Sequence, residues 1–276
     1  MFLRISWLVV LVLFVQLVMA QPPAGETLTP RNADAATALG VRDATQFDQL
    51  MVTVAGVGSS SRFIQEQQTL KPYMMPVRTI GFRGSDWSYA LATCLEYYVN
   101  LSRNFKDNLS PDYISLSLQA GGQRPSLEQG LRFLAQDGTV SAAIVPYDAA
   151  QIPSTVYATA KYNINNFLHL FQPYASPREK TFEMRKALMR GNPVVIEVQA
   201  EADLPQLSQS LVWQPQRTNQ ARTFTLIVVG FDEKAQSFEV LSCWGNTWGN
   251  NGYCWVSYND LANVATNGYV MIPGQY

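Results

Sequence analysis

The first change in hydrophobic pattern along the chain comes at about residue 20. Residues 5–18 form an apolar run that follows a single charge, Arg4, and the small residue Ala20 comes soon after the run ends. The run is short for a membrane span, and this order of features is typical of a secretory signal peptide. The pattern therefore predicts that residues 1–20 direct export, to the periplasm or the outside of the cell, and are then removed, leaving no membrane span.

The next segment, residues 21–70, has a weaker pattern. It is rich in Ala, Thr, Gln, Pro and Ser, and only residues 35–54 show a modest helical rhythm. Such a composition favours a loosely ordered, partly helical arm at the N-terminus.

Helical periodicity dominates the middle of the chain. Residues 85–101 are apolar on every side of a helical wheel, with charges only at Asp86 and Glu96, which is typical of a buried helix. Glu96 is therefore expected to be paired or hydrogen-bonded inside the core. Two more helices are predicted where Ser126 and Ser176 are each followed, three residues later, by a side chain that completes a capping box.

From about residue 194 the pattern changes to short apolar runs and alternation with period two. Strands are predicted at residues 194–198, 223–229, 237–241, 253–258 and 268–272, and the alternation around His169 indicates one more. A helical part followed by a β part predicts an α+β protein. We expect a helical lobe at residues 71–160, a β lobe at residues 161–276, and a cleft between them.

Composition narrows the possible functions. The 276 residues are 47% apolar and 15% charged, enough to bury a large core, and the net charge of −1 argues against a nucleic-acid or membrane-surface partner. Three cysteines are too few for a disulfide scaffold, and no metal-ligand spacing or cofactor motif is present, so no cofactor is expected. Any imidazole chemistry would depend on His169, the single histidine.

Two segments carry a resemblance to a known family. Residues 76–87 read PVRTIGFRGSDW and residues 241–253 read LSCWGNTWGNNGY, and together they resemble the papain family of cysteine peptidases. Two tryptophans, three glycines and a tyrosine keep the family's spacing in the second segment, and weaker matches in the family's order extend over about residues 71–273. The resemblance implies a two-lobed fold with a helical left domain, an antiparallel β-barrel-like right domain and a peptide-binding cleft.

The same resemblance assigns catalytic roles to four positions, and none of them carries the family's residue. Asp86 stands in place of the nucleophilic cysteine, Phe224 of the histidine base, Ser242 of the orienting asparagine and Ile80 of the oxyanion-hole glutamine. A carboxylate is a poor nucleophile toward an amide, and a phenyl ring carries no proton. The sequence therefore predicts a pseudo-peptidase with no catalytic residues.

These four positions also have simpler structural interpretations. Asp86 is expected to cap the N-terminus of its helix. Phe224 and Ile80 would make the old catalytic corner apolar, either filling the cleft or offering an apolar surface to a partner, and Trp244 would border that corner. His169 is expected to be structural, although a displaced pairing with one of the cysteines stays open.

The cysteines suggest one possible bridge. Cys243 and Cys254 flank the loop of a predicted hairpin, so a disulfide between them is feasible if their strands pair in register. Cys94 lies inside the predicted core helix and is expected to be a free, buried thiol. The bridge usual in the papain family is not expected, because Arg83 occupies its first cysteine position.

Three functional hypotheses follow. The first is an exported, inactive papain-like module for peptide or protein binding, or for scaffolding, with a binding surface at Asp86, Trp87, Gly121, Gly122, Phe224, Ser242 and Trp244. The second is a hydrolase with unconventional catalytic residues, for example Asp86 and a second carboxylate. The third is a purely structural envelope component docked through the arm at residues 21–70. That arm could alternatively be a shortened remnant of the family's inhibitory pro-segment.

Overall fold

The computed structural model describes residues 38–57, 66–119, 125–216 and 220–276. The predicted signal peptide and the glycines Gly121 and Gly122 lie outside the described residues. Within the described ranges, each helix is too short or too polar to cross a bilayer.

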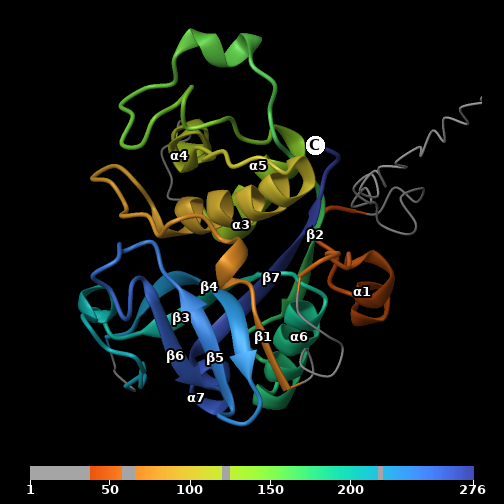
Figure 1. Cartoon of the computed structure of the whole chain (residues 1–276), viewed down its shortest axis with the longest axis vertical. Helices are drawn as coiled ribbons and strands as arrows, with labels where there is room; N and C mark the ends of the chain where they lie inside the picture. The colour runs from red at the N-terminus through yellow and green to blue at the C-terminus, as the bar shows by residue number, and fades with distance from the viewer. Residues whose placement is uncertain (1–37, 58–65, 120–124, 217–219) are drawn as a thin grey trace, which may run out of the picture.

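The structure combines helices with one antiparallel sheet (Figure 1). The α-helices are α1 (Ala44–Leu50), α3 (Asp86–Arg103), α4 (Pro111–Gln119), α5 (Leu127–Gln136), α6 (Pro177–Met189) and α7 (Tyr258–Val264). Short 3-10 helices are η1 (Lys71–Tyr73), η2 (Ser154–Ala158) and η3 (Leu204–Gln206). The strands are β1 (Gln67–Thr69), β2 (Ile164–Phe171), β3 (Val194–Ala200), β4 (Arg222–Asp232), β5 (Ser237–Leu241), β6 (Tyr253–Ser257) and β7 (Ala265–Pro273).

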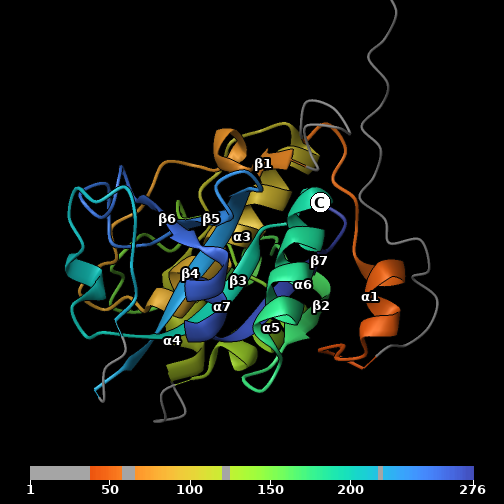
Figure 2. The same cartoon turned by 90° about the horizontal axis from the view of Figure 1, so that it is seen from below.

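The sheet lies between two groups of helices. Its strand order is β2-β7-β3-β4-β5-β6, and β1 adds to β4. Helices α3, α4 and α5 gather on one side, with α3 packed against β4, β3 and β7. Helices α6 and α7 cover the opposite side (Figure 2). The predicted α+β class is confirmed, whereas α7 was not predicted, because a strand was expected to continue to Tyr258, where this helix begins.

Helix α3 is the centre of the core. Its side chains are buried from Trp87 to Val99, apart from the half-buried Thr93, as the apolar wheel predicts. The helix ends at Asn104, whose left-handed backbone (φ 48°) caps the C-terminus. An all-round apolar helix of this kind is stable only between other elements, and α3 has the sheet on one side with α4 and α5 on the other.

The described part of the N-terminal arm is packed against the body, in contrast to the loosely ordered segment expected. Phe47 on α1 is 1% exposed, and Met51 and Val54 are also buried. The buried amide of Asn192 donates to the Val52 carbonyl at 2.7 Å, and Val41 forms an isolated bridge with Leu168 of β2. The helix α1 agrees with the modest helical rhythm of residues 35–54, but the packing of the arm could not be predicted because most of its buried apolar residues lie in turns around this short helix.

The single buried charge of α3 has the partner that was expected. Glu96, 1% exposed at its side chain, forms an ion pair with Arg78, and one of its oxygens also accepts the Leu109 N–H at 2.7 Å. Arg78 donates in turn to the Leu109 carbonyl at 3.3 Å. The pair therefore ties α3 to the segment that precedes it and to the start of α4.

Replacing Glu96 tests this contact. Glu96→Ala is expected to lower the free energy of unfolding by about 3–5 kcal/mol, because it leaves the buried Arg78 charge without a partner. Glu128→Ala removes pairs to the more exposed Arg42 and Arg132 and serves as the control, with an expected loss below about 1 kcal/mol. Urea unfolding of the two variants and the wild type gives the comparison, and equal losses would contradict the role assigned to Glu96.

Candidate functional site

The start of α3 meets β4 through the side chain of Asp86. One carboxylate oxygen accepts the N–H of Trp87 at 2.9 Å, within the first turn of the helix. The other oxygen accepts the N–H of Thr225 on β4 at 2.9 Å. Strand β5 ends at Leu241, opposite Ile227, so Thr225 lies beyond the end of that neighbouring strand. The Asp86 carboxylate supplies the acceptor that β5 does not provide for the Thr225 N–H, and this hydrogen bond joins the helical part to the sheet.

An aromatic corner lies beside this contact. The ring of Phe224, the residue before Thr225, packs edge-to-face on Trp244 with 5.6 Å between ring centroids. Trp244 contacts Trp248 in the same way at 5.4 Å. Both Phe224 and Trp244 keep part of their surface exposed. The corner therefore presents aromatic carbon and has no side chain able to exchange a proton.

The remaining two positions singled out in the sequence lie in the same region. The Ile80 N–H donates to the Cys243 carbonyl at 2.8 Å, and Thr79 forms a bridge with Trp244. The hydroxyl of Ser242 accepts the N–H of Trp244 at 3.3 Å. Contacts through neighbouring residues thus bring Ile80 and Ser242 to the junction where Asp86 and Phe224 already lie.

Comparison with known proteins identifies the family of this chain. The sequence model of the family described as papain family cysteine protease matches residues 65–272 of this chain. The chain belongs to the papain family. It is 22% identical over 204 residues to Peptidase 1 of Dermatophagoides farinae, a match that covers 71% of this chain and 62% of that protein. The chain thus spans less than two thirds of that relative's length.

Solved structures show the same fold. Xylellain, a cysteine protease from Xylella fastidiosa, superposes with a TM-score of 0.62 at 16% identity and covers 91% of this chain and 97% of its own. The Carica candamarcensis cysteine protease CMS1MS2, in complex with E-64, gives a TM-score of 0.61 at 15% identity and covers 76% of this chain and 99% of its own. At such low identity the likeness establishes the fold alone, and the papain-like fold implied by the sequence is confirmed.

A cysteine does lie at this papain-family junction, but at a different position. The Cys243 sulfur is 4.0 Å from the backbone carbonyl of Asp86. Burial, and next the negative charge of Asp86, raise the pKa of Cys243 above its ordinary value. Such a thiol stays protonated at neutral pH, so it differs from an activated nucleophile.

Within the described residues, His169 makes no contact with the Cys243 thiol. His169 lies on β2, with Nε2 3.0 Å from the Asn267 amide oxygen and its ring stacked on Tyr269. Burial lowers its pKa, which keeps the imidazole neutral. These contacts agree with a structural role and offer no partner for a displaced cysteine–histidine pair.

The suggested disulfide between Cys243 and Cys254 is wrong. The β5–β6 register places Cys254 opposite Val240 rather than Cys243, and both thiols are free. The Cys254 sulfur lies 3.6 Å from the Ser210 carbonyl, and burial raises the pKa of Cys254 to about 12. Cys94 is also a free, buried thiol, as expected.

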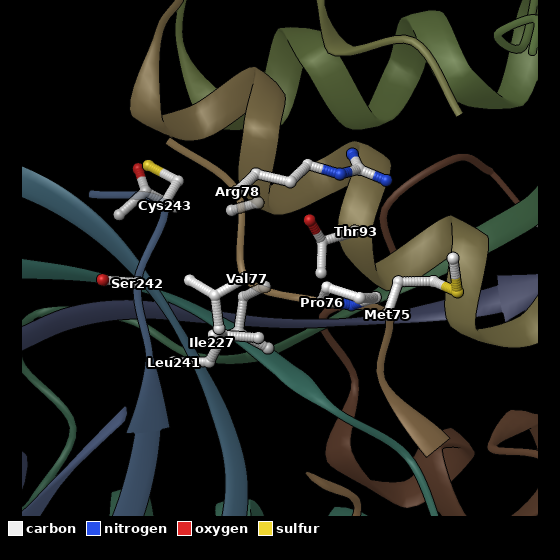
Figure 3. Close-up of a pocket in the computed structure, with 11 residues that line it drawn as sticks. Met75, Pro76, Val77, Arg78, Thr93, Ile227, Leu241, Ser242 and Cys243 are labelled. Atoms are coloured by element: carbon white, nitrogen blue, oxygen red, sulfur yellow. The ribbon is translucent and has the colours of Figure 1, made fainter. Parts of the chain in front are cut away.

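A small cavity lies behind the junction (Figure 3). It is lined by Met75, Pro76, Val77, Arg78, Ala90, Thr93, Thr225, Ile227, Leu241, Ser242 and Cys243. Its volume holds about one water molecule. Figure 3 shows the Arg78 guanidinium directed away from Ser242 and Cys243, so no cation faces these two residues from that side chain. The cavity is too small for a peptide, and any ligand of this region would have to bind outside it.

A second carboxylate lies within electrostatic range of Asp86. Glu197 on β3 pairs in register with Thr225 and accepts the amide N–H of Asn267 at 2.7 Å. Burial chiefly, with a contribution from Asp86, raises the pKa of Glu197. Sequence reasoning missed both Thr225 and Glu197, although an acid within the apolar run of residues 194–198 was a usable signal. Within the described ranges, no group of three or more Cys, His, Asp and Glu residues could hold a metal ion.

Two residues assigned to the binding surface are instead buried. Trp87 is 3% exposed and packs beside Gly130, where an added Cβ would come within 2.9 Å of the indole. Ser242 is 5% exposed, and its hydroxyl accepts the N–H of Trp244, two residues further along the same turn. The burial of Trp87 agrees with the apolar wheel of residues 85–101, whereas its assignment to the binding surface rested on the family resemblance alone.

Removing the Asp86 carboxylate should destabilise the protein. Asp86→Ala leaves the Thr225 N–H, in a residue only 4% exposed, without its acceptor, and we expect a loss of about 1–3 kcal/mol in unfolding free energy. Asp86→Asn retains an acceptor oxygen and should lose less. Urea unfolding measures both, with the exposed Asp203→Ala as control. A loss for Asp86→Ala no larger than that of the control would contradict the contact.

The thiols give a separate test. A chromogenic disulfide reagent is expected to react with none of the three cysteines in the native protein and with all three in urea, without prior reduction. Detection of a single thiol in urea would restore the disulfide that the register excludes.

Proposed function

We propose that this protein is an exported, catalytically silent member of the papain family that binds a peptide or an extended polypeptide segment between its helical part and its sheet. The observation that carries the proposal is the contact of Asp86 with the Thr225 N–H, found where the family places its reacting thiol. Export rests on the signal-peptide pattern of residues 1–20.

Loss of catalysis follows from the chemistry of the corner. Amide cleavage by this family requires a thiolate and a base that takes and returns a proton. Here the carboxylate of Asp86 accepts two backbone N–H groups, and the base position is the Phe224 ring against Trp244. The nearby Cys243 has a raised pKa, which opposes thiolate formation. No acyl-transfer step can be written with these groups.

An exposed aromatic side chain near the corner supports a binding role. Phe82 lies two residues after Ile80 and is 95% exposed. Its loop is held in place because Asp148 accepts the Arg83 N–H at 2.8 Å and forms an ion pair with the Arg83 side chain. A large apolar ring held in solvent next to a family cleft is typical of a contact with a partner.

The alternative of an unconventional hydrolase has one supporting observation, the proximity of Glu197 to Asp86. Two carboxylates with different environments can act as an acid and a base. Against it, both oxygens of Asp86 already accept backbone hydrogen bonds, which favours a structural carboxylate.

Activity measurements distinguish the inactive binding protein from the unconventional hydrolase. The protein without residues 1–20 is expected to release no product from fluorogenic peptides or casein above the level of a no-enzyme blank. Asp86→Ala and Glu197→Gln should give the same result. Turnover that saturates with substrate and disappears in either variant would overturn the proposal and favour the hydrolase.

Binding is tested with reduced, alkylated casein as a model extended polypeptide. Phe82→Ala is expected to weaken binding by about 10-fold, because buried aromatic residues dominate such interfaces. Tyr174→Ala removes another exposed ring, 83% exposed on the connection between β2 and α6, and should leave binding unchanged. Surface plasmon resonance gives both affinities. Equal binding by the wild type and Phe82→Ala would remove Phe82 from the site.

A further inference from the structure

A second hollow lies on the surface of the sheet part, apart from the Asp86 junction. Two loops form it, residues 208–211 between β3 and β4 and residues 246–251 between β5 and β6. Its volume of about 370 Å³ falls in the range of small-ligand sites. The lining residues are Ser208, Gln209, Leu211, Asn246, Thr247, Gly249, Asn250 and Asn251.

The chemistry of this lining is uniform. It contains four amide side chains and two hydroxyls, a single apolar side chain, and no charged residue. Within the described ranges, the side chains of Ser208, Gln209, Asn246 and Thr247 have no hydrogen-bond partner in the protein. The hollow is therefore lined by neutral hydrogen-bond donors and acceptors that a ligand could use.

The two loops are fixed to each other and to the core. The Gly249 N–H donates to the Leu207 carbonyl at 2.8 Å, and the Trp255 N–H donates to the Leu211 carbonyl at 2.9 Å. Trp248, 1% exposed between them, donates its indole N–H to the Leu204 carbonyl at 2.8 Å. Because these bonds set the loop backbones in place before any ligand arrives, binding would cost little ordering of the backbone.

Two residues of the lining have unusual backbone angles. Gln209 and Asn251 adopt φ of 53° and 56°, a left-handed conformation that is uncommon for residues with a side chain. Gln209 lies between the two cross-loop bonds at Leu207 and Leu211, and Asn251 lies in a turn closed by the backbone hydrogen bonds between Asn250 and Tyr253.

We propose that this hollow binds a neutral oligosaccharide built of pyranose rings. An amide side chain offers a donor and an acceptor side by side, which matches adjacent hydroxyls on a sugar ring. Leu211, 61% exposed, supplies an apolar contact for the C–H face of a ring. The lack of charge in the lining gives no counterion to a phosphate, a carboxylate or an amine.

An extended peptide matches the hollow less well. Peptides that bind as strands need a row of backbone groups along a sheet edge, whereas the walls here are turns. The lining of the hollow also shares no residue with the contacts of Asp86 and Phe224. The inference therefore does not rest on the proposed function.

Titration of the protein without residues 1–20 with three probes tests the site: cellotetraose, maltotetraose and the tetrasaccharide of N-acetylglucosamine. At least one is expected to bind with one-to-one stoichiometry by calorimetry, with an affinity that does not change between low and high salt, because no charges take part. Asn246→Ala and Asn250→Ala should each weaken that binding by about 5- to 10-fold, the effect of losing one or two hydrogen bonds.

Controls keep the test decisive. Asn263→Ala removes an exposed amide on α7, away from the lining, and should leave the affinity unchanged. Thermal melts of all variants should match the wild type, since the altered side chains are exposed. Absence of binding by all three probes, or binding that survives both pocket substitutions, would overturn the proposal. Displacement of the bound sugar by alkylated casein would assign the hollow to the peptide groove instead.

Discussion

The hydrogen bond from the Thr225 N–H to the Asp86 carboxylate is the constraint on which the junction of the two parts depends. It connects the first turn of the central helix to a strand that extends past its neighbour. The neighbouring side chains make other contacts. Phe224 packs on Trp244, and the buried Cys243 thiol lies against the backbone carbonyl of Asp86. In this chain a charge-assisted hydrogen bond to the backbone joins the central helix to the sheet at this junction.

The hydrogen bonds of Asp86 limit what the junction can do. A thiolate and an imidazole must approach, exchange a proton and separate, so the family's chemistry needs side chains that are partly free. Asp86 is engaged through both oxygens, and Glu197 shares a hydrogen bond with Asn267. Carboxylates whose oxygens already accept hydrogen bonds are suited to stabilising the fold and poorly suited to transferring protons in catalysis. Function is then expected from binding at the surfaces of the scaffold, the junction included, rather than from chemistry.

Two such surfaces differ in their chemistry. The loop before α3 presents an exposed aromatic ring, Phe82, and is held in place by a hydrogen bond to Asp148. The hollow between residues 208–211 and 246–251 presents neutral amides and hydroxyls on loops fixed by backbone hydrogen bonds. Apolar burial would dominate at the first and hydrogen-bond complementarity at the second, so the two would respond differently to the same substitutions and conditions.

The sequence by itself determined the α+β class, the papain-like fold, the all-round buried helix and the need of Glu96 for a partner. These follow from local periodicity, from the desolvation cost of a buried charge and from motif spacing. Only the tertiary structure decided that Asp86 reaches Thr225, that Glu197 lies near it, and that Cys254 pairs with Val240 instead of meeting Cys243. Each of these depends on strand register or on side-chain direction across elements distant in sequence, and long-range packing fixes both.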